Sequence, residues 1–235
     1  MRDSLRHFTA ELIGTLALVF VGGAAIMGSA ISGSQASLVE IAFAHGLILA
    51  VMVTALMRIS GHFNPAVTLG FLAVRRIEPM MAGVYLVAQL LGAMIGAYLL
   101  KAVFPDPIFA AARGGGQFIS LDITGTQAFI AEMIATFFLV LVVFGTAVDP
   151  KAPRVGGLAI GFTLTAGILA IGPITGGSLN PARTFGPAVA SGVYEGQLIY
   201  WTAPILGGIL AAVLYEYLFM RGAPEPVDHG TVRPA

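Results

Sequence analysis

Six apolar stretches of about bilayer length limit what this chain can fold into more than any other feature. They cover residues 8–30, 38–58, 80–103, 127–148, 155–171 and 197–220. A helix rises about 1.5 Å per residue, so a run of about 20 apolar residues crosses the ~30 Å hydrocarbon core. Because 57% of the 235 residues are hydrophobic and only 10% are charged, we expect an all-α membrane protein with six transmembrane helices.

The chain also contains an internal repeat. The stretch FTAELIGTLALVFVG at 8–22 returns as FIAEMIATFFLVLVVFG at 129–145. Three spans per half is an odd number, so the second half enters the membrane from the opposite side, and an inverted repeat is common in transport proteins. The expected parts are a first repeat at 1–104, a connecting extracytoplasmic loop at 105–125, a second repeat at 126–222 and a disordered tail at 223–235.

Positive charge sets the expected orientation. Nine of the twelve Lys and Arg residues fall on the side of the membrane that holds both termini. Cytoplasmic loops carry an excess of such residues, so we expect both termini in the cytoplasm, and we place the chain in a prokaryotic cell (inner) membrane. The net charge is zero and there is no basic tract, which excludes nucleic acid as a partner.

An Asn-Pro-Ala turn occurs once in each half, within GHFNPAVTLG at 61–70 and GSLNPARTFG at 177–186. Asn before Pro is a helix start signal, and the helices expected at 65–74 and 181–190 reach only ~15 Å. Two such re-entrant half-helices would meet at the bilayer centre. Their positive N-terminal dipoles would repel cations, including hydrated protons, while neutral hydrogen-bonding solutes are accepted.

The two turns differ by one cation. Arg183 stands where the first half has Val67, so only the non-cytoplasmic half carries a fixed positive charge. We therefore expect one narrow gate rather than two.

Glu11 and Glu132 occupy matching places in the two halves. A carboxylate inside a span is costly and needs partners. In a proton-coupled transporter the pair would relay protons, whereas in a channel it would accept hydrogen bonds from backbone N–H groups of the half-helix loops. We favour the structural role, because no further chain of Asp, Glu or His accompanies the two residues.

These residues closely resemble the aquaporin, or major intrinsic protein, family, from AELIGT through both Asn-Pro-Ala boxes to the last span. The resemblance implies a passive water channel that excludes protons and ions, without cofactor or metal, assembled as a homotetramer with one pore per subunit. It places Arg183 at the outer selectivity filter and His62 on the cytoplasmic side of the pore. It assigns the central constriction to Asn64, Pro65, Ala66, Asn180, Pro181 and Ala182.

The resemblance also assigns the rest of the filter to Ile168, Gly177 and His45. Alignment through Ile-Ser-Gly at 59–61 selects His45, and an ungapped alignment would select Ala44. We choose His45, because a loop absorbs a deletion more easily than a helix absorbs a shift. With Arg183 the set is similar to the filter of plant tonoplast intrinsic proteins that pass ammonia as well as water.

In those plant channels a loop residue also reaches the filter, and the candidates here are Gln117 and Phe118. The wider and more apolar filter would pass ammonia, which needs hydrogen-bond donors such as Arg183 and a ring N–H of His45. Arg183 and His45 would supply these hydrogen-bond donors.

Three other functions fit the sequence less well. Glycerol facilitators typically have an acidic residue after the filter arginine and a basic residue four positions on, where this chain has Thr184 and Ala188. An ion-coupled secondary transporter can share the inverted repeat, but a coupling-ion site is missing from the sequence. An enzyme is disfavoured, because the sequence has no nucleophile, metal or phosphate-loop constellation.

Overall fold

The computed structural model describes residues 2–31, 33–34, 36–153 and 155–220, and within these ranges every regular element is a helix. Six helices are long and apolar enough to cross a bilayer. They are α1 (Arg2–Ile31), α2 (Leu38–Leu56), α4 (Pro79–Val103), α6 (Gly125–Val143), α7 (Gly156–Thr175) and α9 (Gln197–Leu214). A wider π-helical turn extends each of two helices: η2 (Phe144–Val148) follows α6, and η3 (Tyr215–Met220) follows α9. The chain is an integral membrane protein, and the six-span prediction is confirmed.

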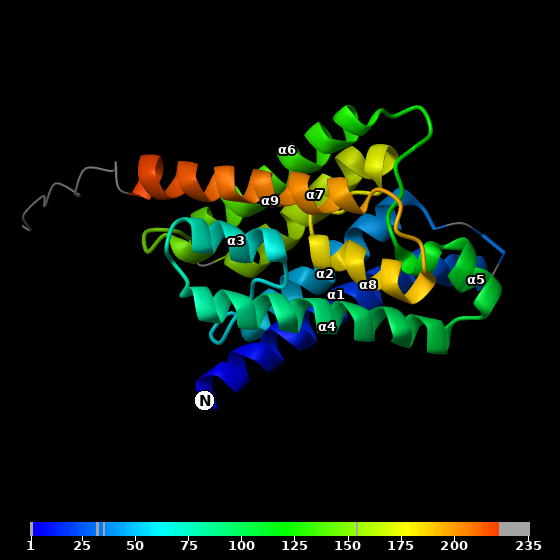
Figure 1. Ribbon diagram of the computed structural model, residues 1–235, viewed down its shortest axis with the longest axis horizontal. Coiled ribbons are helices and arrows are strands. Elements are labelled where there is room, and N and C mark those ends of the chain that lie inside the picture. The colour runs from blue at the N-terminus through cyan, green and yellow to red at the C-terminus, as the bar shows by residue number, and fades with distance from the viewer. Residues whose placement is uncertain (1, 32, 35, 154, 221–235) are drawn as a thin grey trace, which may run out of the picture.

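Two short helices, α3 (Pro65–Ala73) and α8 (Pro181–Ser191), begin at the Asn-Pro-Ala turns. Their 9 and 11 residues reach roughly 14 and 17 Å, about half of the hydrocarbon core. Figure 1 shows α3 and α8 lying end to end between α4 and α9. The two re-entrant half-helices are therefore as predicted, within a residue at each C-terminal end.

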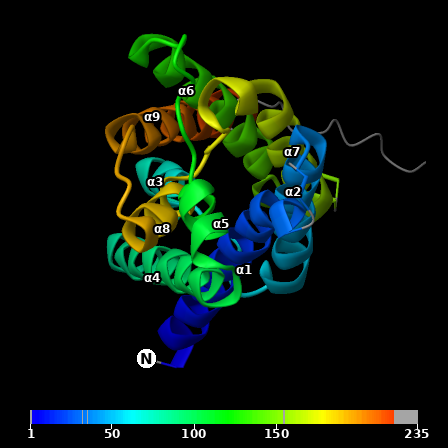
Figure 2. The same ribbon diagram turned by 90° about the vertical axis from the view of Figure 1, so that its right-hand side faces the viewer.

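The packing of the helices follows the repeat. Within each half the first helix packs on the last, α1 on α4 and α6 on α9, and α2 packs on α7 between the halves. Each half-helix packs mainly on a long helix of the opposite half, α3 on α9 and α8 on α4 (Figure 2). The two halves are thus interlocked, and the boundaries expected for them at residues 104 and 126 stay predictions.

Glycines permit the closest of these helix crossings. A side chain at Gly92 or Gly96 on α4 would overlap the backbone of α1, and one at Gly157 or Gly161 on α7 would overlap α2. Small residues at a spacing of four are a common means of close approach in membranes.

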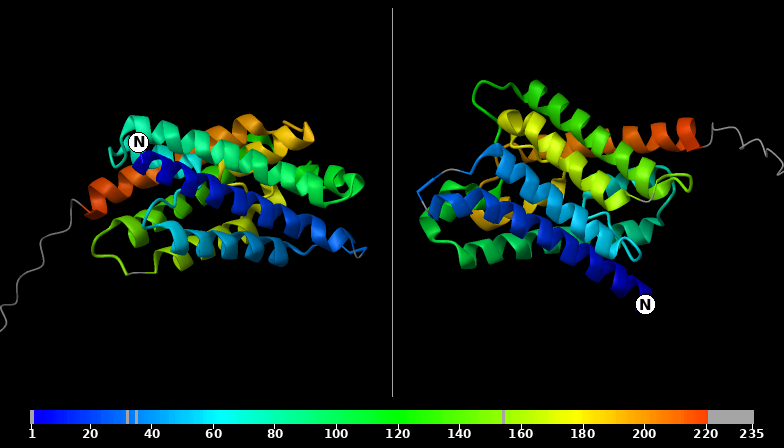
Figure 3. Two further views of the ribbon diagram at one scale, coloured as in Figure 1. Left: turned by 90° about the horizontal axis from the view of Figure 1, so that it is seen from below. Right: turned by 180° about the vertical axis from the view of Figure 1, so that it is seen from behind.

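The first helix begins earlier than predicted. It starts at Arg2 rather than at residue 8, because Asp3 and Arg6 lie one helical turn apart and approach to 3.6 Å. A charged pair at this spacing supports helix beyond the apolar run. Figure 3 shows this end of α1 at the same end of the molecule as the end of η3. The tail expected at 223–235 lies outside the described residues.

Helix α7 ends later than predicted, at Thr175 rather than Ile171, and runs through Pro173. The stop is Gly176, which has a left-handed φ of 77° and donates its N–H to the carbonyl of Gly172. Proline has no N–H, so at this position near the helix end Pro173 costs the helix only one backbone hydrogen bond. The non-helical segment between the end of α7 and the cap residue Asn180 is consequently short, at 176–179. The connecting segment holds one more short helix, α5 (Asp106–Ala111), and a 3₁₀ turn, η1 (Arg113–Gly115).

Candidate pore

A buried carboxylate holds the loop that leads into α3. Glu11 on α1 has no exposed surface, and it accepts hydrogen bonds from the backbone N–H groups of His62 (2.8 Å) and Phe63 (2.7 Å). It also accepts from the hydroxyl of Ser60 and the amide of Gln89 (2.7 Å). Glu11 thus satisfies backbone donors that have no helical partner at this depth in the membrane.

Glu132 on α6 repeats this arrangement for the loop before α8. The fully buried side chain accepts from the N–H groups of Ser178 and Leu179, both at 2.8 Å, and from the hydroxyl of Thr175 at 2.6 Å. The hydrogen-bond donors to both carboxylates are neutral groups. This geometry fits buried acceptors, whereas a proton relay would need titratable neighbours in a chain.

The residue before each asparagine adopts a strained backbone conformation. Phe63 has a φ of 49° and Leu179 a φ of 53°, in the left-handed region that non-glycine residues rarely adopt. In this conformation each carbonyl faces the opposite turn. The side-chain amide of Asn180 donates to the carbonyl of Phe63, and that of Asn64 to the carbonyl of Leu179, both at 2.8 Å. These reciprocal bonds join the two turns directly.

The same asparagines cap their own half-helices. The side-chain oxygen of Asn64 accepts from the N–H of Ala66 (2.9 Å), and that of Asn180 from Ala182 (3.0 Å) and Arg183 (3.3 Å). The proline after each asparagine occupies the first helical position, where its missing N–H costs nothing. Each amide has two hydrogens. One binds the opposite turn, and the other can face the cavity that both asparagines line.

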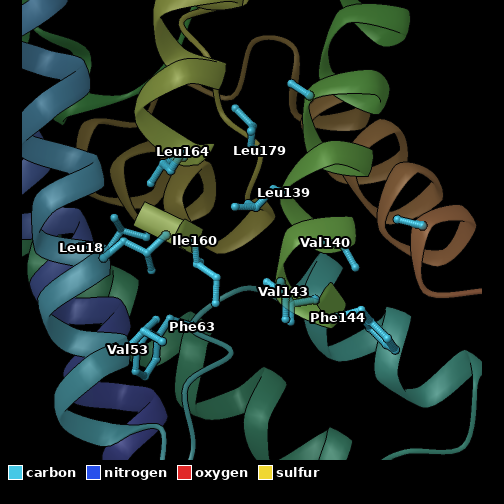
Figure 4. Packing of buried hydrophobic residues seen from close by; sticks show 14 of the residues in the cluster. Leu18, Val53, Phe63, Leu139, Val140, Val143, Phe144, Ile160, Leu164 and Leu179 are labelled. Carbon is cyan, nitrogen blue, oxygen red and sulfur yellow. The ribbon is translucent and has the colours of Figure 1, made fainter. Parts of the chain in front are cut away.

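That cavity is narrow and mostly apolar. Its polar lining comes from His62, Arg183 and the two asparagines, and Figure 4 shows part of its apolar wall. The apolar wall consists of Leu18, Leu49, Val67, Leu139, Val143, Ile160 and Leu164. The space open to the centre of a water-sized molecule is about 20 Å³, and one water needs about 10–15 Å³ by this measure. Solutes of this size would therefore pass in single file.

Arg183 lies on the first turn of α8 and is 2% exposed. Its Nη1 donates to the carbonyl of Gly177 at 2.7 Å, and its buried Nε has no hydrogen-bond partner among the described residues. Arg183 is also one of the residues that line the cavity.

Gly177 is required by its surroundings. It has a left-handed φ of 61°, and a Cβ there would lie only 3.1 Å from the Cα of Ile168. Ile168 is itself fully buried. Both the backbone conformation and the close approach therefore demand glycine.

Gln117, on the connecting segment, reaches Arg183. With its oxygen turned to the guanidinium, the amide accepts from Nη1 (2.7 Å) and Nη2 (3.2 Å) and donates to the hydroxyl of Thr184 (2.7 Å). Gln117 is 6% exposed, whereas Phe118 is 50% exposed and packs against Arg113. Of the two loop candidates, the structure brings only Gln117 to the arginine.

His45 is buried on α2, whereas Ala44 is half-buried. The ring packs against Gly22, where any side chain would overlap it, and lies within electrostatic range of Arg183. Its Nδ1 is 2.7 Å from the carbonyl of Ile41. A carbonyl only accepts, so Nδ1 carries the proton and the neutral ring offers Nε2 as an acceptor. The expectation that neutral His45 donates a ring N–H to a solute is therefore wrong.

His62 is held between two aromatic rings. Its ring centroid lies 4.2 Å from that of Phe71 on α3 and 5.0 Å from that of Tyr85 on α4. Its Nδ1 is 3.1 Å from the hydroxyl of Thr68. The ring lines the cavity in this fixed position.

Sequence reasoning missed the apolar wall, although the repeat contained a signal for it. Leu18 and Leu139 each lie seven positions after the matching glutamates, and both line the cavity. A leucine that recurs on the same face as a duplicated buried carboxylate is a candidate for the pore wall.

A bundle of six spans that encloses a narrow cavity between two half-helices defines a membrane channel. Residues 1–215 match the model of the major intrinsic protein family. The probable aquaporin TIP2-2 of Oryza sativa subsp. japonica is 43% identical over 95% of this chain and 91% of its own length. Aquaporin TIP2-1 of Arabidopsis thaliana is 42% identical over the same shares. An aquaglyceroporin structure from Plasmodium falciparum has a TM-score of 0.80, covering 91% of this chain and 96% of its own, but at 24% identity it shows the fold alone.

The chain therefore belongs to the major intrinsic protein family, the family of the aquaporins. It is a passive channel for water in the membrane and is not an enzyme, as predicted. Its expected location in a prokaryotic inner membrane is unsupported, because both of these aquaporin relatives are plant proteins.

Proposed function

We propose that this channel passes ammonia as well as water and excludes protons and other ions. The observation that carries the proposal is the composition of one end of the pore. There a single fixed cation, Arg183, lies beside a buried histidine, His45, an aliphatic residue, Ile168, and a glycine, Gly177. Such a filter is less polar than one lined by hydrogen-bonding groups on all sides.

The central constriction is assigned to the two capped turns, with Asn64, Pro65 and Ala66 in one and Asn180, Pro181 and Ala182 in the other. Two helix N-termini directed at this point oppose the passage of cations, including hydrated protons. Glu11 and Glu132 support the turns from behind as hydrogen-bond acceptors. Neutral solutes exchange hydrogen bonds with the asparagine amides and move on between apolar walls.

Ammonia suits the filter because it accepts hydrogen bonds better than it donates them. The Nε of Arg183 supplies a buried donor, and Nε2 of neutral His45 supplies an acceptor. Ile168 offers water no polar partner on its side, which reduces the competition between water and ammonia. Gln117 holds the guanidinium from the loop side.

The proposed assembly is a homotetramer with both termini in the cytoplasm. The outward faces of the long helices carry large exposed apolar side chains such as Phe43, Leu47, Val51 and Phe138. Lipid or neighbouring subunits would cover these side chains. Family membership supports four subunits, each with its own pore.

Purified protein in proteoliposomes tests the solute range. Vesicle shrinkage measures water flux, internal alkalinisation measures ammonia flux, and glycerol swelling serves as the comparison. We expect ammonia flux well above that of empty vesicles, and we expect Ile168→His to lower the ammonia-to-water ratio about tenfold. Ile168→Leu is the matched control and should leave the ratio unchanged. Wild-type ammonia flux equal to that of empty lipid would leave a water channel only.

A further inference from the structure

A threonine hydroxyl on the first half-helix connects the pore to the buried polar groups behind it. Thr68 on α3 has no exposed surface, and its Oγ1 lies 3.1 Å from Nδ1 of His62. The same oxygen lies 3.2 Å from the carbonyl oxygen of Asn64 and 2.9 Å from the amide nitrogen of Gln89 on α4. A hydroxyl has one hydrogen and two lone pairs, so these three partners use all of its hydrogen-bonding capacity.

Two of the three partners fix the direction of the bonds. The carbonyl of Asn64 can only accept, so it takes the single hydrogen of the hydroxyl. Gln89 donates, because its amide nitrogen also lies 2.7 Å from Oε2 of Glu11, a carboxylate that accepts hydrogen bonds at both oxygens. The remaining bond to Thr68 must therefore be donated by His62.

The proton of the neutral His62 ring is thus placed on Nδ1. A neutral imidazole with its proton on Nδ1 has a lone pair and no hydrogen at Nε2. This Nε2 makes no hydrogen bond within the described chain and, unlike the Nε of Arg183, is not closed off from open space. Because the ring lines the cavity, Nε2 is the polar ring atom of His62 that is left for a solute.

The second half has the same junction with a different group in place of the imidazole. Thr184, which matches Thr68, accepts from the amide of Gln117 at 2.7 Å and bonds the hydroxyl of Ser178. Ser178 takes the place of His62, two positions before the asparagine. The threonine thus belongs to the duplicated scaffold, and in the first half it holds an imidazole where the second half has a hydroxyl.

We propose that Thr68 is a positioning residue that holds Nε2 of His62 as a bare acceptor, and that this acceptor makes this part of the pore favour water over ammonia. Water donates a hydrogen bond to such an atom readily, whereas ammonia accepts hydrogen bonds better than it donates them. The statement on selectivity rests on the proposed ammonia permeability, and the position of the proton does not. The ammonia-to-water ratio is then set at two places, raised at the filter and lowered at His62.

Solid-state NMR of the channel in lipid bilayers, with ¹³C- and ¹⁵N-labelled histidine, locates the proton. Spectra at about pH 8, where an unperturbed histidine is neutral, separate protonated from bare ring nitrogens, and correlation to Cγ identifies Nδ1. The signal that is missing in His62→Gln belongs to His62. We expect the proton on Nδ1 in the wild type and in Thr68→Ser, which keeps the hydroxyl. In Thr68→Val we expect it on Nε2, because Nδ1 then faces a methyl group that cannot accept.

A wild-type proton on Nε2 would overturn the inference, and this measurement needs no variant that alters Thr68 to fold. A proton that stays on Nδ1 in a folded Thr68→Val variant would show that the threonine does not fix its position, and would overturn the inference as well.

Ammonia and water fluxes in the same proteoliposomes, each corrected for empty lipid, test the selectivity. Their ratio does not depend on the number of folded channels, so poor folding cannot imitate a change. We expect Thr68→Val to raise the ammonia-to-water ratio about threefold, within the range of one hydrogen bond, and Thr68→Ser to restore the wild-type ratio. Thr202→Val is the matched control, because Thr202 bonds the carbonyl of Leu198 four positions earlier in the same way but lies exposed on α9.

An unchanged ratio in Thr68→Val, or an equal change in Thr202→Val, would overturn the selectivity of His62. Wild-type ammonia flux equal to that of empty lipid would contradict the ammonia permeability itself and the selectivity with it. The NMR result would still decide where the proton lies, so the two failures can be told apart.

Discussion

The two ends of the pore are built from repeat-related positions but differ in their chemistry. Gly46 and Gly161 face each other where α2 crosses α7, and they lie 115 positions apart. His45 and Ile160 are also 115 positions apart, so they are equivalent positions of the repeat. One end therefore has an imidazole where the other has an aliphatic side chain in the wall of the cavity.

The half-helices show the same contrast. Arg183 and Val67 each lie three positions after the asparagine of their turn, and both line the cavity. Gly177 and Gly61 each lie three positions before the same asparagines. The scaffold around these positions is alike in both halves, since each has a buried glutamate, a left-handed residue and a capping asparagine. The comparison teaches that a symmetric scaffold can present different side chains to the pore in its two halves, provided that these side chains are not the ones that hold the turn.

The largest expected effect concerns the shared scaffold. Glu132→Ala leaves three donors without an acceptor, at about 1–3 kcal/mol each, so we expect the unfolding temperature in detergent to fall on the order of 10 °C. Glu11→Ala removes the acceptor of four donors and should cost at least as much. A variant that unfolds at the wild-type temperature would show that the carboxylates do not support the turns.

Arg183→Val removes the contrast by making one end of the pore like the other. We expect water flux within about twofold and a cation or proton conductance at least tenfold above wild type, because a barrier lowered by ~1.4 kcal/mol raises a rate tenfold. Voltage clamp of oocytes measures the conductance. Tight insulation in the variant would mean that the two half-helix termini suffice and that arginine only narrows the pore.

Gln117→Leu sharpens the contrast, because it leaves Arg183 in place without its loop partner. The released guanidinium can swing into the lumen, so we expect water permeability to fall about threefold, within the range of one hydrogen bond to a charged group. Phe118→Leu is the matched control and should have no effect. Equal effects of the two substitutions in stopped-flow light scattering would contradict the role of Gln117.

The smallest expected effect is that of a mercurial, which should leave water permeability unchanged. The chain has no cysteine, so mercuric chloride finds no thiol at either end of the pore, and water permeability should be unchanged by it. Stopped-flow light scattering with and without the mercurial makes the measurement. Inhibition that a thiol reagent reverses would contradict this.

The sequence contained most of the fold, because bilayer thickness and helix geometry leave few solutions for six apolar runs. The half-helices were also predictable, since Asn64-Pro65 and Asn180-Pro181 carry their own cap and first-turn residue. The end of α7 was not, because the apolar run that predicts it stops at residue 171, whereas the helix continues through Pro173 to the stop at Gly176. The length of an apolar run therefore did not locate the end of this helix.

The site was predictable only in part. Residue types and the family resemblance indicated His45 and Arg183, but not that the ring nitrogen Nδ1 of His45 is occupied by a carbonyl of its own helix. The left-handed conformation of Phe63 and Leu179 has no sequence signal, since neither residue favours it. Their conformation is held by contacts distant in sequence, which periodicity does not encode: a buried glutamate of the same half accepts from each N–H, and an asparagine of the opposite half donates to each carbonyl.

The reciprocal bonds between the turns also set an order of events during synthesis. When α3 enters the membrane, neither the carbonyl partner of Asn64 nor α9, the helix on which α3 mainly packs, has yet been made. Leu179 leaves the ribosome 115 residues after Asn64, and until then the first turn has polar groups that lipid cannot satisfy. The first half must therefore wait in a wet or protein-lined site, and a ribosome that stalls between the halves would leave an insertion intermediate that quality-control machinery can recognise.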